Sequence, residues 1–167
     1  MSQTAGQTSQ NATSAAQNVA QNAASAAQDA ASAAQNAASA VDTIFAAPHL
    51  RWGVIGCGII ANQMAEVLAS VGRTIDGVAN RTQEKAVAFA QKHHVKRVYD
   101  SIDALLASNE IDAVYLTTPH NTHIIYLRKA LQAGKHVLCE KSITLNSAEL
   151  LEAEELARQN GVQLMDA

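Results

Sequence analysis

The stretch GVIGCGIIA, residues 53–61, decides the fold of this chain. It joins the short apolar run WGVIG to the amphipathic segment IANQMAEVLASVG, a pattern that indicates a buried strand, a tight turn and a helix. Gly56 permits the turn, Gly58 lets the backbone approach a ligand without a Cβ, and Ala61 allows the helix to pack close to the strand.

The spacing of Gly56, Gly58 and Ala61 matches the dinucleotide-binding fingerprint, with alanine in place of the third glycine. The start of the helix presents free N–H groups and a positive dipole end, which suit a pyrophosphate. We therefore predict that this loop binds a cofactor through Gly56, Gly58, Ile59, Ile60 and Ala61. The alternative is a tight turn that binds nothing.

Strands and helices alternate from Arg51 to the end of the chain. After the first strand, apolar runs that indicate strands are TIDGVAN, VKRVY, DAVYLTTP, HVLCEK and VQLMDA, and amphipathic segments separate them. This alternation predicts an α/β fold over residues 49–167, a doubly wound parallel Rossmann sheet of order 3-2-1-4-5-6.

Residues 1–48 differ sharply from the rest. All 12 Lys and Arg residues lie at Arg51 or later, and only Asp29 and Asp42 carry charge before it. The segment is rich in Ala, Gln, Ser and Asn, and polar pairs such as Gln28-Asp29 return every seven residues. Because alanine offers little apolar area, we predict a disordered or weakly helical segment. A partner-binding helix is the alternative.

Composition excludes several classes of protein. A formal net charge of −3 offers no basic field for nucleic acid, and no apolar run approaches the roughly 18 residues of a membrane span. The first residues lack the features of a secretory signal. Cys57 and Cys139 resemble buried small residues more than a disulfide pair. We expect a soluble cytoplasmic protein.

Asn80-Arg81-Thr82 ends the second predicted strand, about 20 residues beyond the glycine loop, where an acidic residue would bind the ribose hydroxyls of NAD. A neutral amide followed by a guanidinium can instead bind a 2′-phosphate. Asn80 and Arg81 therefore favour NADP, with NAD as the alternative. If Arg81 only stacks on the adenine or caps the next helix, either cofactor would fit.

Three segments occur in the order and spacing of one known family: GVIGCGIIA, TTPHNTH at 117–123 and AGKHVLCEKSITLN at 133–146. The chain resembles the glucose-fructose oxidoreductase and inositol dehydrogenase family (Gfo/Idh/MocA). The resemblance covers residues 51–167, the nucleotide-binding domain of that family without its substrate domain. It implies an NAD(P)-dependent dehydrogenase or reductase that transfers hydride between nicotinamide and a carbon of a sugar, inositol or diol.

The family's Glu-Lys-Pro motif falls on Glu140-Lys141-Ser142, with serine in place of proline. The resemblance implies that Lys141 is catalytic, contacting the nicotinamide ribose and the reacting oxygen, and that Glu140 also lies at the cofactor. The alternative is an ordinary Glu140–Lys141 ion pair. Neighbours in a strand point to opposite faces, which disfavours that pairing.

Thr117, Pro119 and His123 lie in the segment TTPHNTH, which resembles the family's Thr-Pro-Asn-x-x-His pattern with His120 in place of asparagine. The resemblance implies that this segment lines the nicotinamide and its ribose. His120, His123 and Cys139 could be read as metal ligands, but no acidic or cysteine cluster surrounds them, so we predict no metal.

Two further interpretations remain open. The chain could be a stand-alone nucleotide-binding module, or an inactive fragment whose N-terminal helix binds a partner. Because the family's second domain would cover part of the surface, we also expect self-association. The substrate and the direction of the reaction are not indicated by the sequence.

Overall fold

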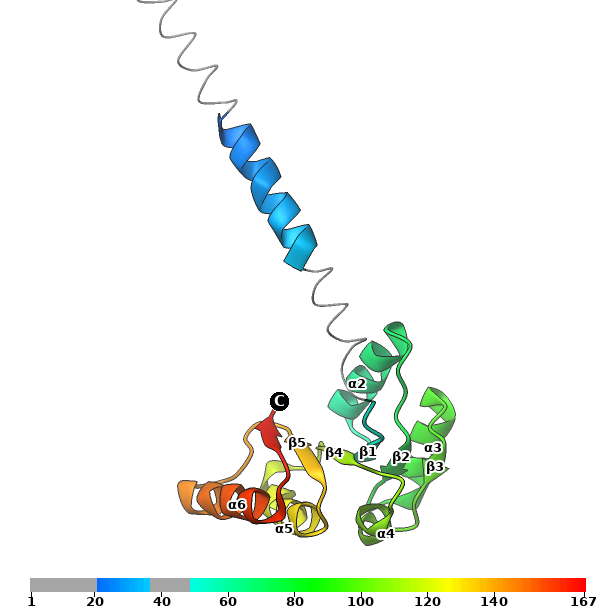
Figure 1. Ribbon diagram of the computed structural model, residues 1–167. Coiled ribbons are helices and arrows are strands. Elements are labelled where there is room, and N and C mark those ends of the chain that lie inside the picture. The colour runs from blue at the N-terminus through cyan, green and yellow to red at the C-terminus, as the bar shows by residue number, and fades with distance from the viewer. Residues whose placement is uncertain (1–20, 37–48) are drawn as a thin grey trace, which may run out of the picture. The chain divides into compact units, whose positions relative to one another are not determined.

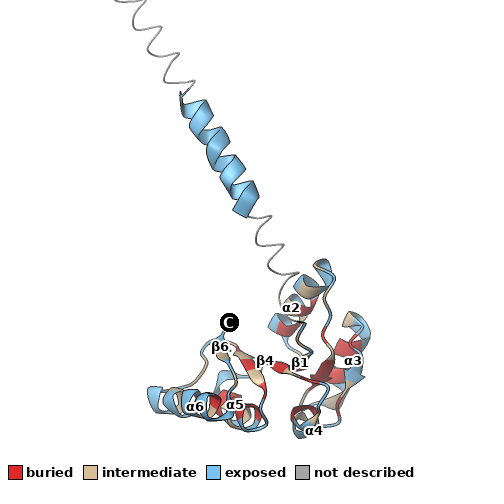
Figure 2. Cartoon of the chain, in the orientation of Figure 1, coloured by how far each residue is buried: buried red, intermediate tan, exposed pale blue. Residues whose placement is uncertain are grey.

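The computed structural model describes residues 21–36 and 49–167. The chain divides between Pro48 and His49 into two units. In the first unit, residues 21–36 form one α-helix whose residues are all exposed, as the pale blue colour in Figure 2 shows. The remainder of the low-complexity segment predicted over 1–48 lies outside the described residues, so its predicted disorder stays a prediction.

The second unit contains a six-stranded sheet (Figure 1). All neighbouring strands are parallel, and the order is β3-β2-β1-β4-β5-β6. This confirms the predicted doubly wound topology. The strands are β1 Trp52–Ile55, β2 Gly77–Ala79, β3 Arg97–Val98, β4 Ala113–Leu116, β5 His136–Cys139 and β6 Leu164–Asp166.

Helices connect the strands and cover both faces of the sheet. They are α2 Ile59–Ser70, α3 Gln83–His93, α4 Ile102–Ala107, α5 His123–Gln132 and α6 Ser147–Asn160, with a short 3-10 turn, η1 His120–Thr122, before α5. The helix that begins at Ser147 is capped by Asn146, whose side chain accepts a 3.0 Å hydrogen bond from the Glu149 N–H. Glu149 in turn accepts from the Leu145 N–H at 3.1 Å, so two backbone donors at the start of α6 are satisfied.

The core consists of two apolar clusters, one on each face of the sheet. Val54 and Tyr115 belong to the cluster beneath α2 and α3, whereas their neighbours Ile55 and Leu116 belong to the cluster beneath α4, α5 and α6. This alternation places successive residues of β1 and β4 on opposite faces. Each buried Leu or Ile side chain stabilises the fold by about 1.5–3 kcal/mol, so burial on both faces holds the sheet between its helices.

The strand order reverses between β1 and β4. Ile55 of β1 lies opposite Leu116 of β4, and the Thr117 N–H donates to the Ile55 carbonyl at 2.9 Å. From this pair, β2 and β3 extend to one side and β5 and β6 to the other. The loops that follow β1 and β4 therefore leave the sheet in opposite directions and open a crevice at its carboxyl edge.

Candidate dinucleotide-binding site

A cleft of about 400 Å³ lies at this switch point. It is bounded by the β1–α2 loop, the end of β2 and the β4–α5 loop. Six predicted site residues line it: Gly56, Gly58, Asn80, Arg81, Thr117 and Pro119. Seven other residues also line it: Cys57, Thr82, Lys85, Ile102, Thr118, Thr122 and Tyr126. The structure thus brings residues from three separate parts of the sequence to one site.

Gly56 is required by the geometry of the first turn. Its φ angle is +102°, and a Cβ there would lie 2.7 Å from the Thr117 Oγ1. Its N–H donates to the Ala79 carbonyl at 3.1 Å, which ties the loop to the end of β2. Only glycine combines this backbone conformation with so close an approach of the two loops.

Gly58 is the N-cap of α2, and no side chain caps the helix at this position. A Cβ on Gly58 would meet nothing within 4 Å, so the backbone is open on that side. The first turn of α2 also contains no acidic residue. Free N–H groups without a competing carboxylate are suited to a pyrophosphate, and the residues present therefore fit a dinucleotide.

The other three predicted loop residues do not line the cleft. Ile59 and Ile60, 77% and 43% exposed, begin α2 at the surface, whereas Ala61 is fully buried against the sheet. Ala61 therefore has the predicted packing position between helix and strand. Only the backbone N–H groups of the two isoleucines are candidates for binding a phosphate.

At the end of β2, Asn80 shapes the turn and Arg81 supplies charge. The Asn80 Nδ2 donates to the Thr82 carbonyl at 2.9 Å. Arg81 and Lys85 both line the cleft, and neither side chain forms a hydrogen bond or ion pair with another residue in the described parts of the chain. Two unpaired cations at this position can accept an anionic ligand.

A second cavity of about 250 Å³ shares Asn80 and Arg81 with the cleft. Asp103 and Lys129 also line it and form an ion pair of 2.7 Å. Because Lys129 already holds the Asp103 carboxylate, Arg81 is the cation of this cavity that remains available to a ligand.

The two cysteines are free thiols. Cys57 lies in the glycine loop, and burial raises the pKa of its thiol to about 11 against the opposing charge of Lys85. Burial likewise raises the pKa of Cys139 to about 12. Both thiols are therefore protonated at neutral pH and act as small packing groups.

Glu140 does not pair with Lys141. The Glu140 carboxylate accepts a hydrogen bond from the Tyr115 hydroxyl, and burial together with this bond raises the pKa of Tyr115. Lys141 is exposed and makes no hydrogen bond or ion pair with any residue that the structure describes. The peptide bond between Lys141 and Ser142 is cis. The ordinary ion pair considered for these two residues is therefore wrong, and the Lys141 amine is free.

His123 is turned into the protein and does not line the cleft. It is 0% exposed, its Nε2 lies 2.7 Å from the Thr118 carbonyl oxygen, and its Nδ1 lies 3.0 Å from the Ser142 carbonyl oxygen. Thr118 lines the cleft, and Ser142 follows Lys141 directly. The ring therefore bridges the two loops from behind. Each carbonyl oxygen can only accept, so a neutral imidazole donates a hydrogen bond to one of them at a time.

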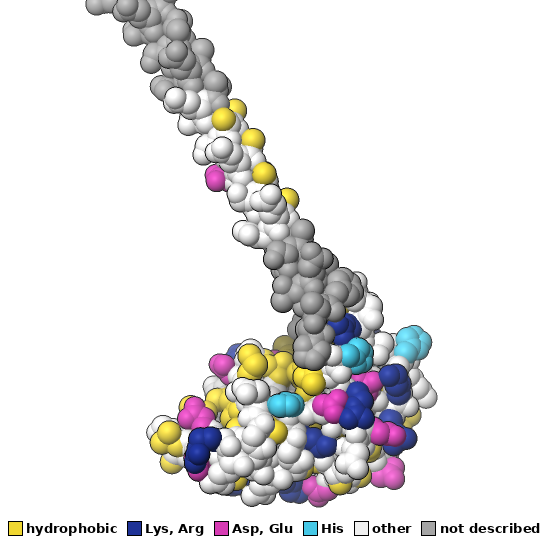
Figure 3. Space-filling view, in the orientation of Figure 1, with side chains coloured by type: hydrophobic (Ala, Val, Ile, Leu, Met, Phe, Trp, Pro, Cys, Tyr) yellow, Lys and Arg dark blue, Asp and Glu magenta, His cyan; other side chains and the backbone are white. Residues whose placement is uncertain are grey.

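No cluster of three or more His, Cys, Asp or Glu side chains within residues 21–36 and 49–167 is arranged to hold a metal ion. Over the same residues, no helix combines the length and apolarity needed to cross a bilayer. Lys, Arg, Asp and Glu side chains are interspersed on the face of the second unit seen in Figure 3.

The parallel sheet, the glycine loop at its switch point and the adjoining cleft define a dinucleotide-binding Rossmann domain. The family model GFO_IDH_MocA, described as an oxidoreductase family with an NAD-binding Rossmann fold, matches residues 50–167. The chain belongs to this family, as the resemblance of its motifs indicated.

Curated relatives include trans-1,2-dihydrobenzene-1,2-diol dehydrogenases of vertebrates. The mouse enzyme is 38% identical over 121 residues, and the human enzyme is 36% identical over the same number. Each alignment covers 71% of this chain but only 36% of the relative. The chain therefore spans little more than a third of the length of these dehydrogenases.

Solved structures of similar fold include a 3-ketoreductase from Actinomadura kijaniata in complex with TDP-benzene and NADP. It has a TM-score of 0.66 and 32% identity, with 71% of this chain and 38% of that chain covered. A UDP-N-acetylglucosamine 3-dehydrogenase from Acidithiobacillus ferrooxidans has a TM-score of 0.65 and 35% identity. The match covers 72% of this chain and 38% of that chain. The relatives are thus dehydrogenases and reductases.

Proposed function

We propose that the chain is the cofactor-binding part of an NADP-dependent dehydrogenase or reductase that acts on a sugar, inositol or diol carbon. The cofactor preference rests on two cations without ion-pair partners among the described residues, Arg81 just after β2 and Lys85 in the first turn of α3. No carboxylate directly follows the strand. Both positive charges would stabilise a bound 2′-phosphate, which is anionic. The diol dehydrogenases and the NADP-bound ketoreductase among its relatives support this proposal.

Each part of the cleft has a role in this proposal. The N–H groups at the start of α2 bind the pyrophosphate, Asn80 and Arg81 bind the adenosine ribose with its 2′-phosphate, and Thr117 and Pro119 line the nicotinamide half. The nicotinamide, when bound, supplies the hydride chemistry. His123 supports the Thr118 and Ser142 backbone behind the site and has no direct contact with the cofactor.

Lys141 is the proposed catalytic residue. Hydride transfer to or from an alcohol carbon requires that a proton leave or join the substrate oxygen, and an amine within hydrogen-bond reach can move it. The exposed, unpaired Nζ of Lys141 is available for this because Tyr115 holds the Glu140 carboxylate. Glu140 supports the start of this loop through its N–H, which donates to the Leu116 carbonyl at 3.0 Å.

Calorimetric titration of the purified chain with NADPH and NADH tests the cofactor proposal. We expect NADPH to bind at least about 10-fold more tightly, and Arg81→Ala to weaken NADPH by about 10-fold while leaving NADH nearly unchanged. Arg158→Ala is the matched control, because the Arg158 side chain pairs with Glu155 on the surface of α6, away from the cleft. Equal affinities for the two cofactors would contradict the preference for NADP.

A turnover assay with a panel of diols and sugars tests the proposed chemistry. Oxidation that Lys141→Met reduces by about 10²-fold or more supports the dehydrogenase over a stand-alone binding module. Cofactor binding without turnover is expected both of a module and of the cofactor-binding part of an enzyme assayed by itself. The remaining alternative is a partner-binding helix. Circular dichroism of a peptide of residues 1–48, alone and mixed with a candidate partner, tests it by measuring helix content.

The exposed apolar side chains of Ile59 and Met165 lead us to propose self-association as well. Light scattering tests it, and a monodisperse monomer would contradict it.

The free thiols Cys57 and Cys139 support a cytoplasmic location, which cell fractionation tests.

A further inference from the structure

Asn62, one turn into α2, is outside the dinucleotide fingerprint and does not line the cleft. We propose that Asn62 is a positioning residue that fixes the phosphate-binding conformation of the glycine loop. The inference rests on the proposed function, since it concerns the same cofactor site. It identifies a hydrogen-bonded link between the end of α3 and the loop that holds the pyrophosphate.

The Asn62 side chain uses both ends of its amide. Its Nδ2 donates to the Gly58 carbonyl at 2.8 Å, and its own backbone N–H donates to the same oxygen at 3.2 Å. Its Oδ1 lies 3.1 Å from the Lys92 Nζ and 2.7 Å from the His93 Nε2. Lysine can only donate and a carbonyl can only accept, so the orientation of the amide is determined by its partners.

The carbonyl of Gly58 matters because of the planar peptide bond. In a trans peptide the C=O and the following N–H point in opposite directions. When two donors hold the Gly58 carbonyl toward α2, the Ile59 N–H is directed away from the helix, at its N-terminal end. That N–H is one of the free donors available to a pyrophosphate.

Gly58 cannot fix this orientation by itself. It has no side chain, no side chain caps α2, and a Cβ at this position would meet nothing within 4 Å. Glycine also has the largest choice of backbone conformations. An external restraint on the Gly58 carbonyl therefore reduces the entropy lost when the cofactor orders the loop.

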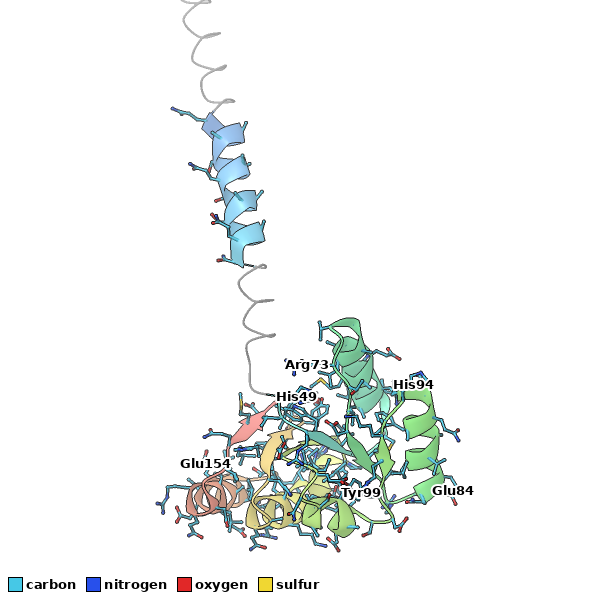
Figure 4. All side chains as sticks on the ribbon, turned by 45° about the vertical axis from the view of Figure 1, so that its right-hand side comes forward. His49, Arg73, Glu84, His94, Tyr99 and Glu154 are labelled. Carbon is cyan, nitrogen blue, oxygen red and sulfur yellow. The ribbon has the colours of Figure 1, made fainter. Side chains whose placement is uncertain are left out.

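The end of α3 holds Asn62 in place. The His93 ring lies 4.7 Å from the Phe89 ring, and burial together with the neighbouring charge of Lys92 lowers the pKa of His93. Because the Asn62 Oδ1 is an acceptor, the His93 Nε2 carries the hydrogen in this contact. Lys92 is also paired with Glu66 of α2 at 3.0 Å. Figure 4 shows the labelled His94 at the end of α3 on the side of α2, and Glu84 at the other end.

Calorimetry of NADPH and NADH binding to variants tests this role. Removal of one such hydrogen bond corresponds to about a 5-fold loss of affinity, and we expect Asn62→Ala to weaken both cofactors by about 5- to 10-fold. Asn62→Asp should be at least as weak, because it keeps the acceptor toward α3 but loses the donor to Gly58. Gln63→Ala is the control, since Gln63 is exposed on the next position of the helix.

His93 provides a second test that leaves the helix start unchanged. His93→Ala should weaken binding of both cofactors by about 3- to 5-fold, and His93→Gln, which retains a donor for the Asn62 Oδ1, should restore most of the affinity. A merely structural role would lower the thermal midpoint of the free protein in both His93 variants without this difference in affinity.

The outcomes separate the two proposals. If the unaltered chain binds neither cofactor, the proposed function is overturned and the inference with it. If it binds a cofactor and Asn62→Ala binds equally well, only the positioning role is overturned. If Asn62→Ala fails to fold, the comparison of His93→Ala with His93→Gln decides the question.

Discussion

The hydroxyl of Tyr115 on β4 donates a hydrogen bond to the carboxylate of Glu140, the residue that follows β5. Tyr115 lies opposite Leu138 in the parallel register, two residues before Glu140. The carboxylate beside Lys141 is therefore held by a neighbouring strand, which leaves the lysine without an ion-pair partner among the described residues.

Tyr115→Phe should lower the free energy of unfolding by about 1.5–3 kcal/mol, because it removes a hydrogen bond to a charged group at a largely buried position. Urea unfolding measures the change. A double-mutant cycle with Glu140→Gln isolates the pair, and a coupling energy below about 0.5 kcal/mol would show that the contact contributes little.

Gly56→Ala should mainly lower the stability of the free protein, whereas Gly58→Ala should mainly lower its affinity for the cofactor. At Gly56 a methyl group meets the Thr117 Oγ1 at 2.7 Å on a backbone with φ of +102°, so we expect a loss of about 2 kcal/mol or more in stability. At Gly58 the methyl group meets no atom within 4 Å, so the free protein should remain stable while cofactor affinity falls at least 10-fold. Thermal unfolding and calorimetry together check both; equal destabilisation by the two substitutions would refute this distinction.

His123→Ala should cost about 2–4 kcal/mol of stability, because it leaves a cavity and removes the ring nitrogens that lie within hydrogen-bond distance of two carbonyl oxygens. It should also speed hydrogen exchange of the backbone amides of 141–143, which the ring supports from behind. His123→Gln can keep one of the two bonds and should recover part of the loss. If amide exchange in this loop does not change, His123 contributes to packing alone.

The contribution of Asp112 should depend on pH. Arg51 donates from its Nε to the Asp112 Oδ2 at 2.8 Å, and this bonding lowers the pKa of Asp112 to about 2, from an ordinary value of about 3.9. A lowered folded-state pKa gives stability that is fully present above about pH 4 and is lost as the pH falls toward 2. The difference in unfolding free energy between the unaltered chain and Asp112→Asn should shrink over that interval. A difference that stays constant from pH 6 to pH 2 would contradict this.

The sequence was sufficient to predict the strand order, because the alternation of strands and helices leaves few topologies for a parallel sheet. The sequence pattern overestimated the length of the second strand, because TIDGVAN contains only the three-residue β2. Asp76, directly before β2, binds the Trp52 backbone of β1 through both its N–H and its carboxylate. Element ends depend on such contacts between distant residues, and local pattern does not contain them.

The candidate site was predicted in part. Glycine spacing located Gly56 and Gly58 because the backbone itself requires those residues. The motif around His123 did not reveal that its ring is buried between two carbonyls. Nor does the sequence reveal that Asn62 and Phe89 contact the His93 ring at the end of α3. Pairings such as Tyr115 with Glu140 follow from the register of β4 and β5, which sequence alone does not supply.

The crevice between β1 and β4 also affects when the protein can first bind its ligand. Thr117 contacts Ile55 across 62 positions of sequence, so the two walls of the cleft come from segments that lie far apart in the chain. During synthesis, β4 must therefore emerge from the ribosome before the nucleotide-binding cleft can form. Contacts of such long sequence separation slow folding. We conclude that ligand binding during synthesis would report assembly of the central strand pair, and that shorter nascent chains would remain unliganded.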